Sequence, residues 1–374
     1  GMHGGPVDVE GYAAGQRAAR PIVNYAATVS HRAVREAAGA TDRYGPATPE
    51  QVEEMKGLAR RAIRSGAVGI GFGLNYSPGA EYEEVYAIFE VAAEEGVPGH
   101  LHARYKGNVF PLTMSLAAME VVAMAAATGA QAQLAHLISS TVGSAPLSIA
   151  LAEGASEHGV DVGFDFHVWT RNQTSLQSAL YDEGWQERFG GADYSDIYVA
   201  RTQERLDSAR FHELRAEPDP ISVQTEFIPE EEIVMGLESP LGIVSSDGGG
   251  LVEGTGHPRS VGTFARFLGR YVRDLAVVDW MEGIRKITVL PASRLEKAVP
   301  RMGLKGRLQV GADADVTVFD PGTVRARATY ANPDRRSAGI PWVVVNGQVV
   351  VENGVVLDGP APGQWLRHPE PAGG

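Results

Sequence analysis

The chain has 374 residues, of which 44% are hydrophobic, so it can bury the core of one large domain or of two ordinary ones. Its 46 acidic and 33 basic residues give a formal net charge of -13, and the sequence has no basic cluster, which excludes a nucleic acid as partner. The absence of cysteine excludes disulfides, thiolate metal ligands and a cysteine nucleophile.

The most apolar segment, residues 112–130, is long enough to suggest a membrane span. Glu120 interrupts it, however, and its residues are mostly alanine and methionine together with Ser115 and Thr128. We therefore interpret this segment as a buried amphipathic helix that ends at Gly129. The expectation is a cytoplasmic protein with no membrane partner.

Helices and strands alternate through most of the chain. A first strand is expected within residues 21–30, and a helix over residues 50–65 has Thr48 as N-cap, Pro49 in its first turn and Gln51 to complete a capping box. This alternation predicts a parallel sheet covered by helices. The other expected barrel strands are 68–73, 97–102, 131–136, 160–166 and 241–245, and the helices between them include 81–95 and 146–158.

Two regions break this alternation. Residues 170–220 are polar and aromatic without a clear period, which predicts a substrate loop inserted into the barrel. Beyond residue 301, alternating valines and the turn signals Asn346-Gly347 and Asn353-Gly354 predict a small antiparallel β module. We therefore expect a barrel over residues 1–300 and a β-sandwich portion over residues 301–374.

Polar side chains follow several of the predicted strands at the point where each strand ends. His102, His136 and Asp247 occupy such positions, and barrel enzymes place their chemistry at this rim. Neutral imidazoles ligate zinc, the metal lowers the pKa of bound water to about 7, and a carboxylate takes up the proton. A lone strand-end histidine is more often a structural residue, but the repetition favours a metal site.

Two weaker motifs receive structural interpretations. The glycines Gly69, Gly71 and Gly73 do not have the spacing of a dinucleotide loop, so close packing at a strand is expected instead. Asp313 and Asp315 are expected to cap a turn before a strand rather than to bind a cation.

Longer motifs along the sequence resemble a known family. They are AVGIGFGLNYSP, LHAR at His102, LAH at His136, SSDGG at Asp247, GHPRSVGTFARFLGRYVRD, and KGRLQVGADADVTVFDP followed by VVNGQVVVENG. Over nearly its whole length the chain resembles the D-aminoacylase (N-acyl-D-amino-acid deacylase) branch of the amidohydrolase superfamily. The resemblance implies a (β/α)8 TIM-type barrel with an accessory β-sandwich, and metal-assisted hydrolysis of an amide on a D-amino acid.

The resemblance also implies roles for individual residues. His102 and His136 match the histidine ligands of the fifth and sixth strands, and Asp247 matches the eighth-strand aspartate, a metal ligand that acts as general base and then as acid. A small-molecule amide is the implied substrate, and one or two divalent ions, by default zinc, are the implied cofactor. The implied substrate-binding residues are Arg104, His167, Trp169, His257 and Arg259.

The sequence departs from the family pattern at two points. Family members carry a His-x-His pair on the first barrel strand and a metal-bridging residue on the second, whereas this sequence matches from near the helix before the third strand. His3 lacks a second histidine and a preceding apolar strand, so we do not expect it to bind metal. The deacylases also carry a lysine where this chain has Ile138, which leaves the substrate open.

A barrel without its first two strands would expose strand edges near Ile22 and Leu241. We expect these edges to be covered by an upstream segment, by a separate chain or by a second copy in a homo-oligomer. The alternative to an amidohydrolase is a truncated or degenerate homologue that performs no hydrolysis and serves as a binding or assembly subunit.

Overall fold

The structure is a computed structural model and describes residues 4–369, so His3 lies outside the described residues. Six strands form a parallel sheet in the order β1-β2-β3-β4-β5-β9, which confirms the expected strands of a TIM-type barrel. Within residues 4–369, β1 and β9 each pair with a single neighbour in this sheet. The strands are β1 (Val29–Ser30), β2 (Ile70–Gly73), β3 (Gly99–His102), β4 (Ala132–Leu134), β5 (Val162–Phe166) and β9 (Gly242–Val244).

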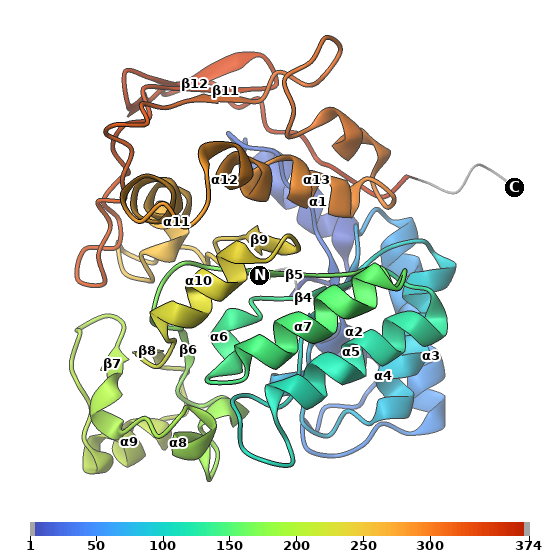
Figure 1. The fold of residues 1–374 in the computed structure, drawn as a ribbon. Helices are drawn as coiled ribbons and strands as arrows, with labels where there is room; N and C mark the ends of the chain where they lie inside the picture. Colours follow the sequence, from blue (N-terminus) through green and yellow to red (C-terminus); the bar gives the residue numbers. More distant parts are fainter. Residues whose placement is uncertain (1–3, 370–374) are drawn as a thin grey trace, which may run out of the picture.

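Helices that connect the strands cover the outer side of this sheet (Figure 1). The capping box that the sequence predicts is confirmed: the Gln51 N–H donates to Thr48 Oγ1 at 3.3 Å, and the Thr48 N–H donates to Gln51 Oε1 at 2.9 Å. No helix within the described residues is long and apolar enough to cross a membrane. The covering helices are α2 (His31–Ala37), α3 (Pro49–Arg64), α4 (Tyr82–Glu94), α5 (Met114–Thr128), α6 (Ile138–Thr141), α7 (Ala145–Glu157) and α10 (Glu230–Glu238).

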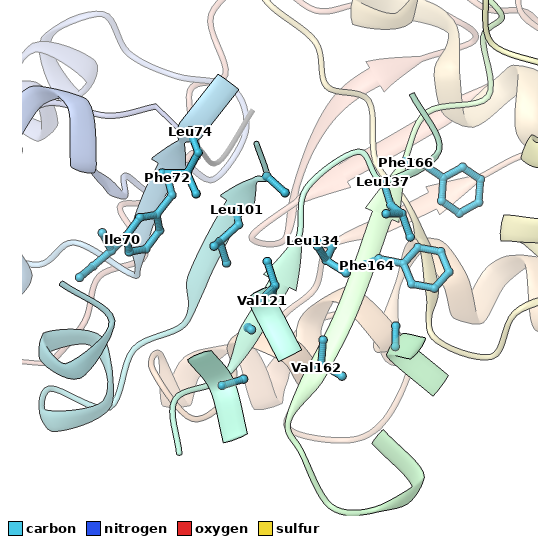
Figure 2. Packing of buried hydrophobic residues seen from close by; sticks show 14 of the residues in the cluster. Ile70, Phe72, Leu74, Leu101, Val121, Leu134, Leu137, Val162, Phe164 and Phe166 are labelled. Atoms are coloured by element: carbon cyan, nitrogen blue, oxygen red, sulfur yellow. The ribbon is translucent and has the colours of Figure 1, made fainter. Parts of the chain in front are cut away.

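The barrel core consists of apolar side chains from the parallel strands. Phe164 and Phe166 lie on the same side of β5 because alternate residues of a strand share a face, and both are fully buried (Figure 2). Parallel strands covered on both faces carry few polar residues, which explains the apolar runs in the sequence. A Cβ on Gly69 would lie 2.8 Å from the Pro98 carbonyl oxygen, so close packing is the role of this glycine.

Residues 170–220, for which the sequence predicts an irregular loop, instead contain a small folded unit. Its antiparallel sheet has the order β6-β8-β7, and residues 222–225, which directly follow the predicted loop, form the central strand of this sheet. Strands of two to four residues are too short to show the alternation of apolar and polar residues by which a strand is predicted. The elements are β6 (Thr174–Ser175), α8 (Trp185–Arg188), β7 (Ile197–Val199), α9 (Ser208–Arg215) and β8 (Ser222–Thr225), packed around Leu180, Tyr181, Trp185, Phe189, Phe211 and Val223.

The C-terminal part forms the antiparallel sheet that the sequence predicts, on the opposite side of the barrel from the inserted unit (Figure 1). Asn346 and Gly347 have φ values of 46° and 80°, as a tight hairpin turn requires. Lys305 Nζ lies 2.7 Å from Asp313 and 2.6 Å from Asp315, so an internal lysine neutralises this acidic pair. The strands are β10 (Val316–Val318), β11 (Trp342–Val345), β12 (Gln348–Glu352) and β13 (Val355–Val356).

Further helices lie between the barrel and this sheet or precede the first strand. They include a π-helical segment, which continues directly from α11. These elements are α1 (Val9–Ala18), α11 (Arg259–Arg266), the π-helix (Phe267–Asp274), α12 (Trp280–Ile287) and α13 (Val289–Leu295).

A buried polar cluster that no sequence motif predicts joins α2 to α4. Glu84 Oε1 accepts a hydrogen bond from Arg35 Nε at 3.0 Å and lies 2.8 Å from His31 Nε2. Burial alone would raise the pKa of Glu84, but the contacts with His31 and Arg35 outweigh it, so the net pKa is lowered. The carboxylate therefore stabilises the fold in its ionised form.

Glu84→Gln should reduce the free energy of unfolding at pH 7 by about 3 kcal/mol, because it leaves the buried Arg35 guanidinium without its carboxylate. The folded pKa is depressed, so this contribution is present above the ordinary glutamate pKa of 4.5 and is lost as the pH falls through the folded value. Urea unfolding at pH 7 and pH 4 measures both effects. Glu83→Gln, on the exposed neighbouring residue, is the matched control, and equal losses for the two variants would contradict the role of the cluster.

Candidate functional site

A pocket of about 330 Å³ opens at the rim where the barrel strands end. Its wall contains residues from the ends of β3 and β4, from the loop after β9 and from the inserted unit. Among the sequence candidates, the residues that line it are His102, His136, Asp247, His257 and Arg259. The site is therefore shared between the barrel and the insertion.

His102 and His136 are in ring contact at the centre of this rim. Their ring centroids are 4.4 Å apart and their planes lie at 83°. They approach because β3 and β4 are adjacent parallel strands, so the residues that follow them emerge side by side. His102 Nδ1 lies 3.2 Å from the Asn75 side-chain amide, and the Tyr76 ring packs edge-on against His102 at 5.0 Å.

The hydrogen bonds around His136 assign its tautomer. Ser139 Oγ donates its proton to the His136 carbonyl oxygen at 2.8 Å, so its 3.1 Å contact with Nδ1 requires that Nδ1–H be the donor. The lone pair then belongs to Nε2. The His136 backbone N–H donates to Asp165 Oδ1 at 3.2 Å, and Ser245 Oγ donates to the same oxygen at 2.7 Å. These contacts hold His136 at a φ of 36°, a conformation that side chains rarely adopt.

Asp247 is connected to a chain of polar groups on the far wall. Arg259 NH1 lies 3.0 Å from Asp247 Oδ2 and 3.2 Å from His167 Nε2. The Arg259 backbone N–H donates to His257 Nδ1 at 3.0 Å, and His257 Nε2 lies 3.1 Å from the Arg171 carbonyl oxygen, which it reaches as a donor. Asp247 itself has a φ of 44°, so the tight turn after β9 carries backbone strain at the site.

Burial and charge set the protonation states of the pocket. Burial lowers the pKa of His136, and burial together with the Arg259 charge lowers the pKa of His167 and His257, so these imidazoles are neutral. Burial alone would raise the pKa of Asp247, but several neighbouring groups, Arg259 foremost among them, together outweigh it and hold this pKa below its ordinary range. The pocket thus contains neutral imidazoles beside an ionised carboxylate.

Three of the expected substrate-binding residues lie behind the pocket wall. Arg104 donates to Glu120 Oε1 at 2.8 Å and to the Ala80 carbonyl oxygen at 2.7 Å. Trp169 Nε1 donates to Thr263 Oγ1 at 3.1 Å, and His167 contacts Arg259. None of the three lines the pocket in the described part of the chain. His167 and Trp169 contact Arg259 and His257, which do line it, whereas the partners of Arg104 do not.

Lys106 is a pocket residue that sequence reasoning missed. It lies on the loop after β3, lines the pocket and is 4% exposed. Burial, reinforced by the Arg259 charge, lowers its pKa from 10.5 to about 7, although Asp247 acts in the opposite direction. A lysine in a loop carries no periodicity, and only the folding of this loop against the insertion brings it into the pocket.

The residues present offer the donor chemistry of a zinc site. His102 and His136 are adjacent imidazoles, and Asp247 is an ionised carboxylate on the wall of the same pocket. Within residues 4–369, however, no group of three or more histidine, aspartate or glutamate side chains gathers at metal-binding spacing. The described residues thus supply two neighbouring ligands of the right kind and a third in the same pocket.

Known proteins share this fold and are similar in sequence over most of the chain. N-acyl-D-glutamate deacylase of Alcaligenes xylosoxydans xylosoxydans is 32% identical over 357 residues, which cover 92% of this chain and 70% of that protein. The crystal structure of N-acyl-D-glutamate deacylase from Bordetella bronchiseptica, complexed with zinc and a phosphonate mimic of the tetrahedral intermediate, is 31% identical with a TM-score of 0.81, covering 96% and 75% of the two chains. No family model matches the chain.

A structure of D-aminoacylase, from work on the role of its binuclear metal centre, is 27% identical with a TM-score of 0.82 and covers 96% of this chain and 75% of that one. The fold is that of the TIM-barrel amidohydrolases. Within that class, the chain belongs to the D-aminoacylase (N-acyl-D-amino-acid deacylase) family, as its sequence motifs predict.

The lowered pKa of Lys106 predicts a pH-dependent stability. Below pH 7 the lysine is charged in both states and the folded chain bears the cost of the buried charge; between about pH 7 and 10.5 the unfolded chain binds more protons, so the free energy of unfolding rises with pH. The free energy of unfolding of wild type, measured relative to that of Lys106→Met, should therefore rise by about 2 kcal/mol from pH 6 to pH 9.

Urea unfolding across this pH range measures the shift. Lys297→Met, which removes the same charge from an exposed position, is the control and should show no comparable trend. A difference between wild type and Lys106→Met that does not change with pH would contradict the lowered pKa.

Proposed function

We propose that this chain is a metal-dependent amidohydrolase that cleaves the amide bond of an N-acyl-D-amino acid. The observation that carries the proposal is the pairing of His102 and His136 in one pocket with the ionised Asp247. The identity to N-acyl-D-glutamate deacylase over most of the chain supports the same reaction class. Hydrolysis of a small N-acyl amino acid is also compatible with a polar pocket of this volume.

In this proposal His102 and His136 hold a divalent metal ion, with zinc as the first choice, and Asp247 completes the ligand set. Bound zinc would activate a water molecule and polarise the amide carbonyl. Asp247 then accepts the proton of the attacking water and returns it to the departing amine. Its lowered pKa keeps it ionised, which is the form that a general base requires.

The remaining candidates divide into two groups. We propose direct substrate contact for His257 and Arg259, which line the pocket. Arg259 then serves two partners, since its guanidinium also lies 3.0 Å from Asp247. His167 and Trp169 act as positioning residues for Arg259 and the wall around it, and Arg104 holds the loop after β3 through Glu120.

Metal analysis tests the ligands. Zinc-loaded wild type should retain its metal after gel filtration. His102→Ala and His136→Ala should lose it, because each variant lacks one imidazole ligand and binds zinc more than about tenfold more weakly. The readout is zinc content by inductively coupled plasma mass spectrometry. His158→Ala, on the exposed end of α7, should retain zinc as wild type does, and unchanged zinc in both pocket variants would overturn the assignment.

Kinetics test the general base. Asp247→Asn should lower kcat for release of acetate from N-acetyl-D-glutamate by about 10²- to 10⁴-fold, because the amide cannot accept the proton. Asp274→Asn changes an exposed aspartate in the same way and serves as the control. Equal rates in wild type and Asp247→Asn would remove this aspartate from the reaction.

A second candidate is a binding protein that performs no hydrolysis. It is favoured by one observation, namely that no three-ligand group occurs within residues 4–369. This candidate predicts that N-acetyl-D-glutamate binds the zinc-treated chain without release of acetate. Calorimetry and an acetate assay on the same preparation separate the two functions.

A further inference from the structure

The pocket contains a buried lysine that forms no ion pair within the described part of the chain. Lys106 lines the pocket and is 4% exposed, and within the described residues its ammonium group makes neither a hydrogen bond nor an ion pair. Burying an ammonium ion without a counter-charge is costly, so such a group usually marks a place where a ligand supplies the charge. Lys106 takes no part in the proposed metal chemistry, which leaves its role unassigned.

Two aromatic rings of the inserted unit and its border hold Lys106 in place. Its Nζ lies 4.7 Å from the centroid of Phe189 and 4.2 Å from that of Phe227, and these two rings are stacked at 4.8 Å. Ring faces attract a cation but do not neutralise it. The aromatic pair therefore orients the amine of Lys106, and a ligand that supplies a negative charge would favour its protonated form.

The backbone next to Lys106 is fixed as well. The Gly107 N–H donates to the Ser140 carbonyl oxygen at 2.8 Å, which ties the loop to the turn after His136. Gly107 has a φ of 78°, and a Cβ there would lie 2.1 Å from the Arg188 carbonyl oxygen of the insertion. Only glycine allows this approach, so the position of Lys106 is built into the contact between barrel and insertion.

The charges of the described residues that line the pocket do not balance. Among residues 4–369, Arg259 and Lys106 are the cations of the lining and Asp247 is its carboxylate, which lies 3.0 Å from Arg259. The neutral imidazoles contribute no charge. Once Arg259 and Asp247 are counted as a pair, the charge of Lys106 is left for the ligand, which must be anionic.

We propose that Lys106 is a specificity-determining residue that binds a carboxylate group of the substrate. The inference rests on the proposed function, because an N-acyl amino acid carries an α-carboxylate and its acidic members carry a second carboxylate in the side chain. The carboxylate replaces the missing counter-charge at the ammonium group, and a charge-assisted hydrogen bond in a desolvated pocket strengthens binding. Neutral amides of similar shape bind poorly, since they leave the buried ammonium unpaired.

Calorimetric titrations of the full-length chain in EDTA test the proposal without any hydrolysis. The probes are N-acetyl-D-glutamate, N-acetyl-D-glutamine, which lacks the side-chain carboxylate, and the α-amide of N-acetyl-D-glutamate, which lacks the α-carboxylate. Lys106→Met and the more polar Lys106→Gln should weaken N-acetyl-D-glutamate binding by at least about tenfold. Lys106→Arg keeps the charge and should recover part of the loss, and Lys297→Met is the exposed control.

The pattern across the three probes identifies the carboxylate. Wild type should bind one of the two amides about as weakly as Lys106→Met binds N-acetyl-D-glutamate. The carboxylate that this amide lacks is then the group that Lys106 recognises. Affinities that change less than twofold in both folded neutral variants would overturn the proposal. Equal losses for all three probes would overturn it too, because the effect would then not depend on a particular carboxylate.

A zinc-loaded activity assay separates this inference from the proposed function. Lys106→Met should raise KM for N-acetyl-D-glutamate by a similar factor and change kcat less. If no preparation hydrolyses the substrate but binding still depends on Lys106, the proposed function fails and the carboxylate site stands. If hydrolysis proceeds with unchanged KM in Lys106→Met, the carboxylate site fails and the proposed function stands.

Discussion

The functional end of this molecule depends on the parallel pairing of β3 with β4. Leu101 and Leu134 are register partners in these strands, so the residues that follow them emerge at the same rim. His102 and His136 therefore reach ring contact although a complete helix separates them along the chain. The same geometry at β9 brings Asp247 to the pocket. Loss of this strand alignment would scatter the site even if every helix still formed.

Burial then determines what these groups can do. Removal from water keeps His136 neutral, whereas neighbouring groups, Arg259 foremost among them, keep Asp247 ionised despite its burial. The inserted unit contributes to this environment because it closes one side of the pocket and provides the rings over which Lys106 lies. The proposed metal binding, proton transfer and recognition of an anionic amide would all depend on the same exclusion of water.

Signals that act over a few residues predicted most of the fold. Thr48 and Gln51 cap α3 through hydrogen bonds between the side chain of each residue and the backbone of the other. Asn346 favours the left-handed turn of a hairpin whatever its tertiary surroundings. Strand ends such as His102 and His136 were also predictable from short-range signals, because each follows a short apolar run. The inserted sheet escaped prediction, because strands of two to four residues carry no period and are stabilised by distant aromatic neighbours.

By itself, the sequence determined the alternation of helices and strands, the C-terminal hairpins, the family, and the order in which strand-end histidines and the aspartate occur. Only the tertiary structure decided which charges meet: Arg104 pairs with Glu120 behind the wall, Glu84 joins His31 in the core, and Lys106 enters the pocket. The physical reason is range. Caps and turns are local interactions, whereas the partner and the burial of a charged side chain depend on residues that folding brings together from far along the chain.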